Sequence, residues 1–506
     1  MQSALTQFSF NRQDFNLILP QLELTLFGLG ILLIDFFVEA RVKYLNAVLA
    51  VMGTLFSGYT LWMLRAHLQI QAEVDPQRPD LLGFHDTLLV DSFFLYFAAI
   101  FLAATALVVL LSVRYLEIED EHHGEYYALI LFACVGMMFM ASGIDLVVLF
   151  LGLETMALSF YALTGFLRRD KRSNEAALKY VLLGAFSSGI LAYGFSLLYG
   201  MSGSTNIGQI GQMLGRRAMI SQMGGLTDWF TIVAFVTVAA GLFFKIAAVP
   251  FHQWAPDVYE GAPTPVTAYV SVASKTASFA LLLRLFIAVF GATHHSWMYI
   301  VAGVAVASLT WGNFAAITQT NVKRLLAYSS IAHVGFILLG LVGGNNTGFQ
   351  GIAYYLFVYV FMTIGAFAVV IVLRRKGLIG DELEDLNGLY QRSPAAALLL
   401  LIFMLSLAGI PPTAGFMGKY YILQSLIETH HPVLAVLAAL YIVPALYYYF
   451  RIVVHAWMKQ PGDAPLPEIS AAQTVALTVT VFVSLAAGVY PEPFAQLARY
   501  AFAIGR

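Results

Sequence analysis

The sequence predicts an all-α protein that crosses a membrane many times. Of its 506 residues, 59% are hydrophobic and only 11% are charged, whereas about a quarter of the residues in an ordinary soluble domain are charged. Apolar runs of about 18 to 25 residues recur along the whole chain, and each is long enough to span a hydrocarbon core about 30 Å thick. Lipid, rather than water, is therefore expected to surround most of the protein.

Charge and cysteine content exclude several classes of function. The formal net charge of -2 and the isoelectric point near 6.6 give no sign of a nucleic-acid partner. The single cysteine, Cys134, cannot form an internal disulfide or hold a metal or iron–sulfur cluster together with other thiolates. The sequence contains no GxGxxG, Walker A or HExxH pattern. We therefore expect no cofactor in this chain, and an ion gradient or a partner protein must supply any energy that it uses.

Apolar runs between charged or Pro/Gly breaks predict about fourteen transmembrane helices. The first run contains Glu23, lacks a small-residue cleavage site and follows an amino terminus without a basic region, so it is interpreted as a spanning helix. The expected spans are residues 17–37, 44–66, 91–113, 125–142, 145–167, 175–200, 229–249, 265–289, 296–318, 323–341, 350–373, 395–427, 432–457 and 471–490.

Basic residues concentrate in the loops that follow the odd-numbered helices. These loops include the runs RRDKR at 168–172 and RRK at 374–376, whereas the loops after even-numbered helices contain only Arg65, Arg78, Arg216 and Arg217. By the positive-inside rule, the odd-numbered helices end in the cytoplasm. Both termini are therefore expected on the outer side of the membrane.

Two helices contain prolines that interrupt them. The seventh includes KIAAVPFHQW around Pro250, and the twelfth includes SLAGIPPTAGFMGK around Pro411 and Pro412. A proline leaves the carbonyl four residues before it without a partner, so the carbonyls of Leu407 and Ala408, for example, are expected to be free to hold water. The broken helices are five apart and run in opposite directions, which predicts two inverted five-helix repeats, helices 4–8 and 9–13.

The repeats divide the chain into four parts. Residues 1–120 form helices 1–3, residues 121–290 form the first repeat, residues 291–458 form the second repeat, and residues 459–506 form helix 14.

Ionisable side chains at membrane depth cost several kcal/mol and mark functional sites by default. Counting about 1.5 Å per residue places three such groups near the midplane, two beside the breaks, and one about 9 Å from the cytoplasmic end of helix 6. Glu154, Lys275 and His333 are the groups near the midplane, and Lys245 and Lys419 are those beside the breaks. Lys179 is the group near the end of helix 6. Their row across both repeats predicts lateral transfer of charge between helices.

Protons suit this chemistry, because burial favours the neutral form of an amine and a nearby carboxylate favours the charged form. A moving contact between a glutamate and a lysine would thus switch proton affinity along the row. The depths of Glu154 and Lys179 differ by roughly 9 Å on the same count, so a direct ion pair between them stays open.

Simpler structural roles stand beside this interpretation. Each deep lysine can be a structural charge with a packed partner, and His333 can be a satisfied hydrogen-bonding residue between helices. Glu23, which lies outside both repeats, is expected to be structural. Asp35 and Arg284 lie near helix ends and are expected to extend toward the membrane surface.

Five stretches of the sequence together are similar to one family. They are LGLETMALSFYAL, SNEAALKYVLLGAFSSGILAYGFSLLYG, GLFFKIAAVPFHQWAPDVYEGAPTPV, QTNVKRLLAYSSIAHVGF and LSLAGIPPTAGFMGKYYI. Over roughly residues 17 to 490, the chain resembles the antiporter-like N subunit of proton-translocating NADH:quinone oxidoreductase, respiratory complex I. The resemblance implies fourteen helices with two inverted five-helix repeats.

The resemblance also implies roles for the deep residues. The sister L and M subunits usually have histidine where this chain has Lys275, the M type has glutamate at the position of Lys419, and the L type continues into a long lateral helix. These features favour the N type. The implied positions are Glu154 in helix 5, its partner Lys179 in helix 6, Lys245 in broken helix 7, Lys275 in the centre of helix 8 and Lys419 in broken helix 12.

The implied function is proton translocation driven by electron transfer from NADH to quinone. NADH, FMN, iron–sulfur clusters and quinone are expected in partner subunits, which include M- and K-type subunits of the membrane arm. A bacterial inner membrane, with both termini on its periplasmic side, is the expected location. The alternatives are a subunit of a cation/proton antiporter, a related ferredoxin-driven complex, and a structural scaffold with inert charges.

Overall fold

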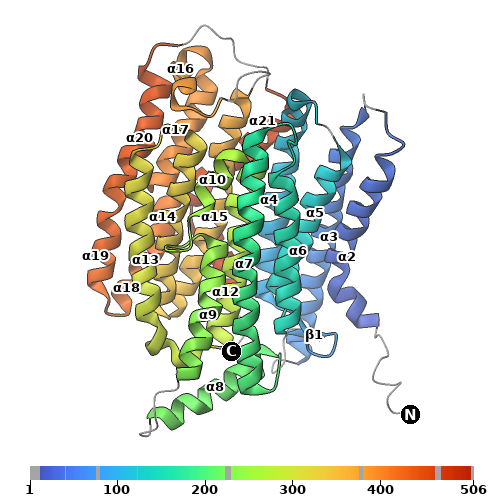
Figure 1. The fold of residues 1–506 in the computed structure, drawn as a ribbon, viewed down its shortest axis with the longest axis vertical. Coiled ribbons are helices and arrows are strands. Elements are labelled where there is room, and N and C mark those ends of the chain that lie inside the picture. Colours follow the sequence, from blue (N-terminus) through green and yellow to red (C-terminus); the bar gives the residue numbers. More distant parts are fainter. Residues whose placement is uncertain are drawn as a thin grey trace.

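The computed structural model is a bundle of long helices that run roughly side by side (Figure 1). It describes residues 12–39, 42–75, 80–121, 123–222, 229–374, 380–461 and 469–502. Within these residues, 13 helices are long and apolar enough to cross a membrane, and α17 (Pro394–Ala408) with α18 (Ala414–Glu428) forms a further, broken one. The predicted all-α membrane fold with about fourteen spanning helices is therefore confirmed.

The other spanning helices follow the predicted order. They are α2 (Arg12–Ile34), α3 (Leu45–Val74), α4 (Ser92–Glu119), α5 (Gly124–Ser142), α6 (Leu146–Thr164), α7 (Lys171–Ser202), α9 (Trp229–Ile246) with its continuation α10 (Trp254–Gly261), the joined segments α11 (Thr264–Tyr269), η3 (Val270–Ser274) and α12 (Lys275–Ala288), α13 (His294–Ile317), α14 (Val322–Gly343), α15 (Asn346–Leu373), the joined segments α19 (Pro432–Leu440) and α20 (Ile442–Met458), and α21 (Ala471–Val489).

Polar residues just before several helices explain where those helices begin. Asp145 caps α6 by accepting a hydrogen bond from the amide of Val147 at 2.8 Å. Asn321 caps α14 by accepting one from the amide of Arg324 at 3.1 Å. Such side chains satisfy amide groups that have no partner within the first helical turn. The cap at Asn321 also places Lys323 and Arg324 at the start of α14.

The structure adds short elements that hydropathy does not indicate. Strands β1 (Leu81–Gly83) and β2 (Leu88–Val90) pair as an antiparallel hairpin, and α8 (Ile207–Gln222) follows α7. In Figure 1, β1 and α8 lie at the lower end of the bundle and α16 (Leu389–Arg392) at the upper end, as alternating spans require. The remaining short elements are η4 (Gly291–Thr293), η5 (Leu383–Leu386) and α22 (Glu492–Tyr500).

The centre of the bundle is formed by α14 and α15, which are buried along nearly their whole length. The outer helices α19, α20 and α21 instead expose many apolar side chains. Helix α14 contacts both α10 and α18, the second halves of the two broken helices. Side chains on α14 are therefore placed to connect the two breaks.

The expectation that Arg284 extends toward the membrane surface is wrong. The Arg284 guanidinium donates two hydrogen bonds, of 2.7 and 2.8 Å, to the Asp91 carboxylate, and its Nε donates to the carbonyl of Ala141 at 2.9 Å. Asp35 forms an ion pair with Lys43 at 3.2 Å. Arg284 thus has a charged partner inside the protein, and a guanidinium that donates two hydrogen bonds to one carboxylate is among the strongest arrangements these groups form. Asp35 and its partner Lys43 lie in the connection between α2 and α3.

Asp80, in the loop before β1, predicts a pH-dependent stability. Partial burial and the nearby charge of Asp91 raise the pKa of Asp80 to about 6, against the opposing effect of Arg284. Because this pKa is above the unfolded value of about 4, ionising Asp80 costs stability, and that cost grows as the pH rises from about 4 to about 6. We therefore expect Asp80→Asn to raise the melting temperature of the purified protein at pH 7.5.

The expected gain is about 1 kcal/mol once solvent screening of this half-exposed group is allowed for. It should shrink as the pH is lowered toward about 4 and vanish below that, because the carboxyl is then protonated in both the folded and the unfolded state. Asp86→Asn, an exposed change in the same hairpin, is the matched control. A gain that grows at low pH would contradict the sign of the shift.

Candidate functional site

The first helix break lies beside Lys245. Helix α9 ends at Ile246, one residue after this lysine, and α10 begins at Trp254. The Lys245 ammonium is buried and donates hydrogen bonds to Ser188 Oγ at 3.1 Å and to the Tyr161 hydroxyl at 3.5 Å. Its two acceptors come from α7 and α6, so the lysine connects the broken helix to its neighbours in the first repeat.

The second break lies beside Lys419. Helix α17 ends at Ala408 and α18 begins at Ala414. The Lys419 ammonium donates to the carbonyls of Ala408 at 2.7 Å and Leu407 at 3.3 Å. These are the carbonyls that Pro411 and Pro412 leave without helical partners. The expected occupant of that place was water, whereas the structure shows a lysine side chain there.

The two breaks share a local backbone arrangement. Ala247 has a left-handed conformation, with φ of 59°, three residues before Pro250, and Gly409 has φ of 83° three residues before Pro412. A Cβ atom added to Gly409 would lie 2.8 Å from Cδ of Lys419. The backbone conformation and the close approach of the lysine therefore both favour glycine at this position, although Ala247 adopts a similar conformation at the first break.

Lys275 and His333 lie between the breaks. Lys275 directly follows the π-helical turn η3 and donates a hydrogen bond of 2.5 Å to Ser330 Oγ on α14. One turn further along α14, His333 Nδ1 lies 2.7 Å from the Tyr355 hydroxyl and Nε2 lies 3.0 Å from the Tyr449 hydroxyl. Hydroxyl groups can both donate and accept protons. Lys275 thus reaches from the first repeat to the helix that carries His333.

The basic groups of this row are buried. The exposed fraction is 4% for Lys245, 1% for Lys275, 4% for His333 and 4% for Lys419. Because all four are buried, the neighbouring groups of the protein decide how well their charges are stabilised. His333 lies within electrostatic range of Lys275 and Lys419, and Glu154 lies within range of Lys245.

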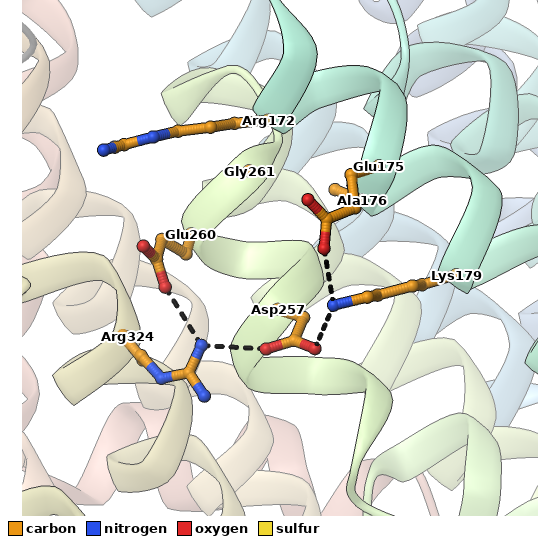
Figure 2. A pocket seen from close by; sticks show the side chains of 8 residues that line it. All are labelled: Arg172, Glu175, Ala176, Lys179, Asp257, Glu260, Gly261 and Arg324. Carbon is orange, nitrogen blue, oxygen red and sulfur yellow. Dashed lines mark hydrogen bonds and ion pairs between the residues drawn. The ribbon is translucent and has the colours of Figure 1, made fainter.

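Lys179 has partners other than Glu154. Its ammonium lies 2.8 Å from Asp257 Oδ2 and 2.8 Å from Glu175 Oε1, as Figure 2 shows. Glu154 Oε1 is buried without a hydrogen-bond partner. Among the described residues, no ion pair joins Lys179 to Glu154, in keeping with the difference in depth expected from the sequence.

The partners of Lys179 belong to a charged cluster around a cavity of about 260 Å³. Arg324 Nη1 lies 2.8 Å from Asp257 Oδ1 and 3.0 Å from Glu260 Oε2. Sequence reasoning placed none of Asp257, Glu260 and Arg324 in the candidate site. The sequence feature that could have identified them is an acidic pair three residues apart on a short helix, together with a basic pair at the start of α14. In the parts of the chain that the structure describes, no cluster of His, Cys, Asp or Glu side chains is arranged to hold a metal ion.

The fold and the buried charges define an antiporter-like subunit with many membrane spans. A family model described as "NADH:quinone oxidoreductase/Mrp antiporter, TM" matches residues 143–443. The chain belongs to this family, and within it to the subunit N group of NADH-quinone oxidoreductase. The resemblance recognised in the sequence motifs is therefore confirmed.

Relatives and solved structures support this assignment. The chain is 51% identical to NADH-quinone oxidoreductase subunit N 2 of Solibacter usitatus, over 97% of this chain and 98% of the relative. It is similar to a chain of respiratory complex I from Thermus thermophilus with bound aureothin, with 31% identity, a TM-score of 0.78, and coverage of 95% and 99%. A chain of the Mrp complex from a Dietzia species has a TM-score of 0.78 over 96% and 97% of the two chains, but at 20% identity it shows the fold alone.

Proposed function

We propose that this chain is a proton-translocating membrane subunit of NADH:quinone oxidoreductase. The observation that carries the proposal is the buried row from Lys245 through Lys275 and His333 to Lys419. It contains a lysine at each helix break, and Lys275 and His333 at its centre each contact hydroxyl groups of neighbouring helices. Groups that are buried in both repeats and can exchange protons form a path through the middle of the membrane.

Each member of the row has a part in this path. Lys245, Lys275 and, through water, His333 pass the proton across the centre, and Lys419 leads toward the outer face. Glu154 and Lys179 form the switch that receives the coupling signal. Because a carboxylate favours the charged form of a nearby amine, movement at this switch changes the proton affinity of Lys245.

The energy for pumping comes from partner subunits. Moving one proton against about 100 mV requires about 2.3 kcal/mol, and electron transfer from NADH to quinone supplies it. NADH, FMN, the iron–sulfur clusters and quinone bind to the partners, which include M- and K-type subunits of the membrane arm. The complex lies in a bacterial inner membrane, and both termini of this chain face the periplasm.

A cation/proton antiporter subunit is the second candidate, because the Mrp chain has the same fold. The candidates differ in what drives proton movement. Inverted vesicles that contain the assembled protein should take up protons when NADH is oxidised, without requiring sodium. Proton movement that follows a sodium gradient and ignores NADH would favour the antiporter.

Glu154→Gln tests the switch within the proposed function. The amide keeps the size of the side chain but removes the charge that acts on Lys245, so coupled proton uptake should fall about fivefold or more. Glu117→Gln, at an exposed carboxylate on α4, is the control and should pump normally. Native gels verify assembly, and wild-type uptake by a fully assembled Glu154→Gln protein would remove Glu154 from the switch.

A further inference from the structure

Asp257 on α10 joins the two repeats through a single carboxylate. Its Oδ2 accepts a hydrogen bond of 2.8 Å from Lys179 on α7, and its Oδ1 accepts one of 2.8 Å from Arg324 on α14 (Figure 2). Helix α7 belongs to the first repeat and α14 to the second. The half-helix that follows the first break is therefore held between cations of both repeats.

We propose that Asp257 is a positioning residue that holds Lys179 in the charged cluster, away from Glu154, and that Lys179 leaves and regains this contact during pumping. The inference rests on the proposed function and extends it to a residue outside the buried row. While Asp257 holds Lys179, Glu154 keeps a buried Oε1 without a hydrogen-bond partner and acts on Lys245 instead. Lys179 is suited to exchange because an ammonium carries three donors on a flexible stem.

Glu175 differs from Asp257 as a partner of Lys179. It lies one turn away on the same helix, and its side chain is 66% exposed. A partner on the same helix stays near Lys179 throughout and cannot report movement between helices. Asp257 lies on a different element and is only 32% exposed, so its contact with Lys179 forms or breaks when α10 and α7 move relative to each other.

Arg324 makes the departure of Lys179 tolerable. It contacts Glu260 at 3.0 Å as well as Asp257, so the Asp257 carboxylate keeps a cation when Lys179 leaves. Leaving such a group without any partner would be costly. The adjoining Lys323 donates to the carbonyl of Ala262 at 3.0 Å. Ala262 lies at the end of α10. Arg324 therefore connects the Asp257 carboxylate to α14, and Lys323 connects the end of α10 to α14.

This arrangement carries a coupling signal between the repeats. A shift of α14 moves Asp257 through Arg324 and moves the end of α10 through Lys323. Either movement changes how firmly Asp257 holds Lys179. The cluster is partly exposed around its cavity, so its ion pairs are weak enough to exchange, unlike those of fully buried charges.

A double-mutant cycle on coupled proton uptake tests the pairing. We expect Asp257→Asn to lower uptake about fivefold, because the amide no longer holds Lys179 by charge. The double variant with Lys179→Ala should be no slower than Lys179→Ala alone, since both changes remove the same contact. Asp257→Glu restores the charge and should recover most of the uptake. Glu117→Gln, at an exposed carboxylate on α4 outside the cluster, is the control and should pump at nearly the wild-type rate.

The result that would overturn the proposal is a set of losses from Asp257→Asn and Lys179→Ala that multiply in the double variant. Wild-type uptake by an assembled Asp257→Asn protein would overturn it as well. Either failure is distinct from failure of the proposed function, which is tested by arginine substitutions at Lys245 and Lys275. Full activity of those arginine variants would remove the buried relay, whereas the cycle concerns only what holds Lys179.

Discussion

Lys419→Met is expected both to destabilise the second helix break and to stop most coupled proton uptake. The change removes the ammonium that donates to the carbonyls of Leu407 and Ala408. Each buried acceptor left without a donor costs about 1 to 3 kcal/mol, and lipid offers no replacement. Methionine keeps the length of the side chain but cannot carry a proton.

Lys419→Arg separates these two consequences. A guanidinium still donates hydrogen bonds, so the melting temperature of the purified complex should return toward the wild-type value. It stays protonated in proteins, so proton uptake should remain low. Lys459→Met, at an exposed lysine beyond α20, is the control for loss of a positive charge. If Lys419→Met leaves the melting temperature unchanged, the carbonyl contacts do not stabilise the break.

Lys245→Arg is expected to impair pumping nearly as much as Lys245→Gln. Arginine retains the positive charge and can donate to Ser188 and Tyr161, the two acceptors of Lys245. It does not release a proton, and a positioned proton-transfer group contributes far more than tenfold to a rate. We therefore expect uptake by inverted vesicles to fall at least about tenfold in both variants.

Comparing Lys245→Arg with Lys245→Gln shows whether Lys245 carries protons or only supplies a static charge. If Lys245 only supplies a static charge, the arginine variant pumps well and the glutamine variant fails. Lys171→Arg, at an exposed position in the first turn of α7, controls for the substitution itself. A fully active Lys245→Arg variant would remove this lysine from the proton path, because a group that stays protonated cannot relay a proton.

Hydropathy and proline positions predicted most of the fold. Each spanning helix corresponds to an apolar run of its own, and Pro250, Pro411 and Pro412 mark the breaks. These signals are local and do not depend on how neighbouring helices pack. The hairpin of β1 and β2 was not predicted because its strands, Leu81–Gly83 and Leu88–Val90, are too short to show a periodic pattern. Local signals therefore gave the architecture and omitted its smallest elements.

The sequence indicated which residues form the candidate site but not which residues contact one another. Counting along helices predicted a depth for each lysine and left open whether Lys179 pairs directly with Glu154. It did not identify Asp257 as the partner of Arg324, 67 residues away, or Asp91 as the partner of Arg284, 193 residues away. Such contacts depend on how helices rotate and pack against one another, which the hydrophobic pattern of a nearly uniformly apolar helix does not specify.

Proton uptake by inverted vesicles carrying Lys275→Arg is the most direct test of proton transfer through the buried row. Lys275 is 1% exposed, and its bond to Ser330 links the first repeat to the helix that carries His333. The measurement is the initial rate of uptake during NADH oxidation, normalised to the amount of assembled complex on native gels. We expect the rate to fall to that of Lys275→Ala. Uptake at the wild-type rate would contradict proton transfer by Lys275.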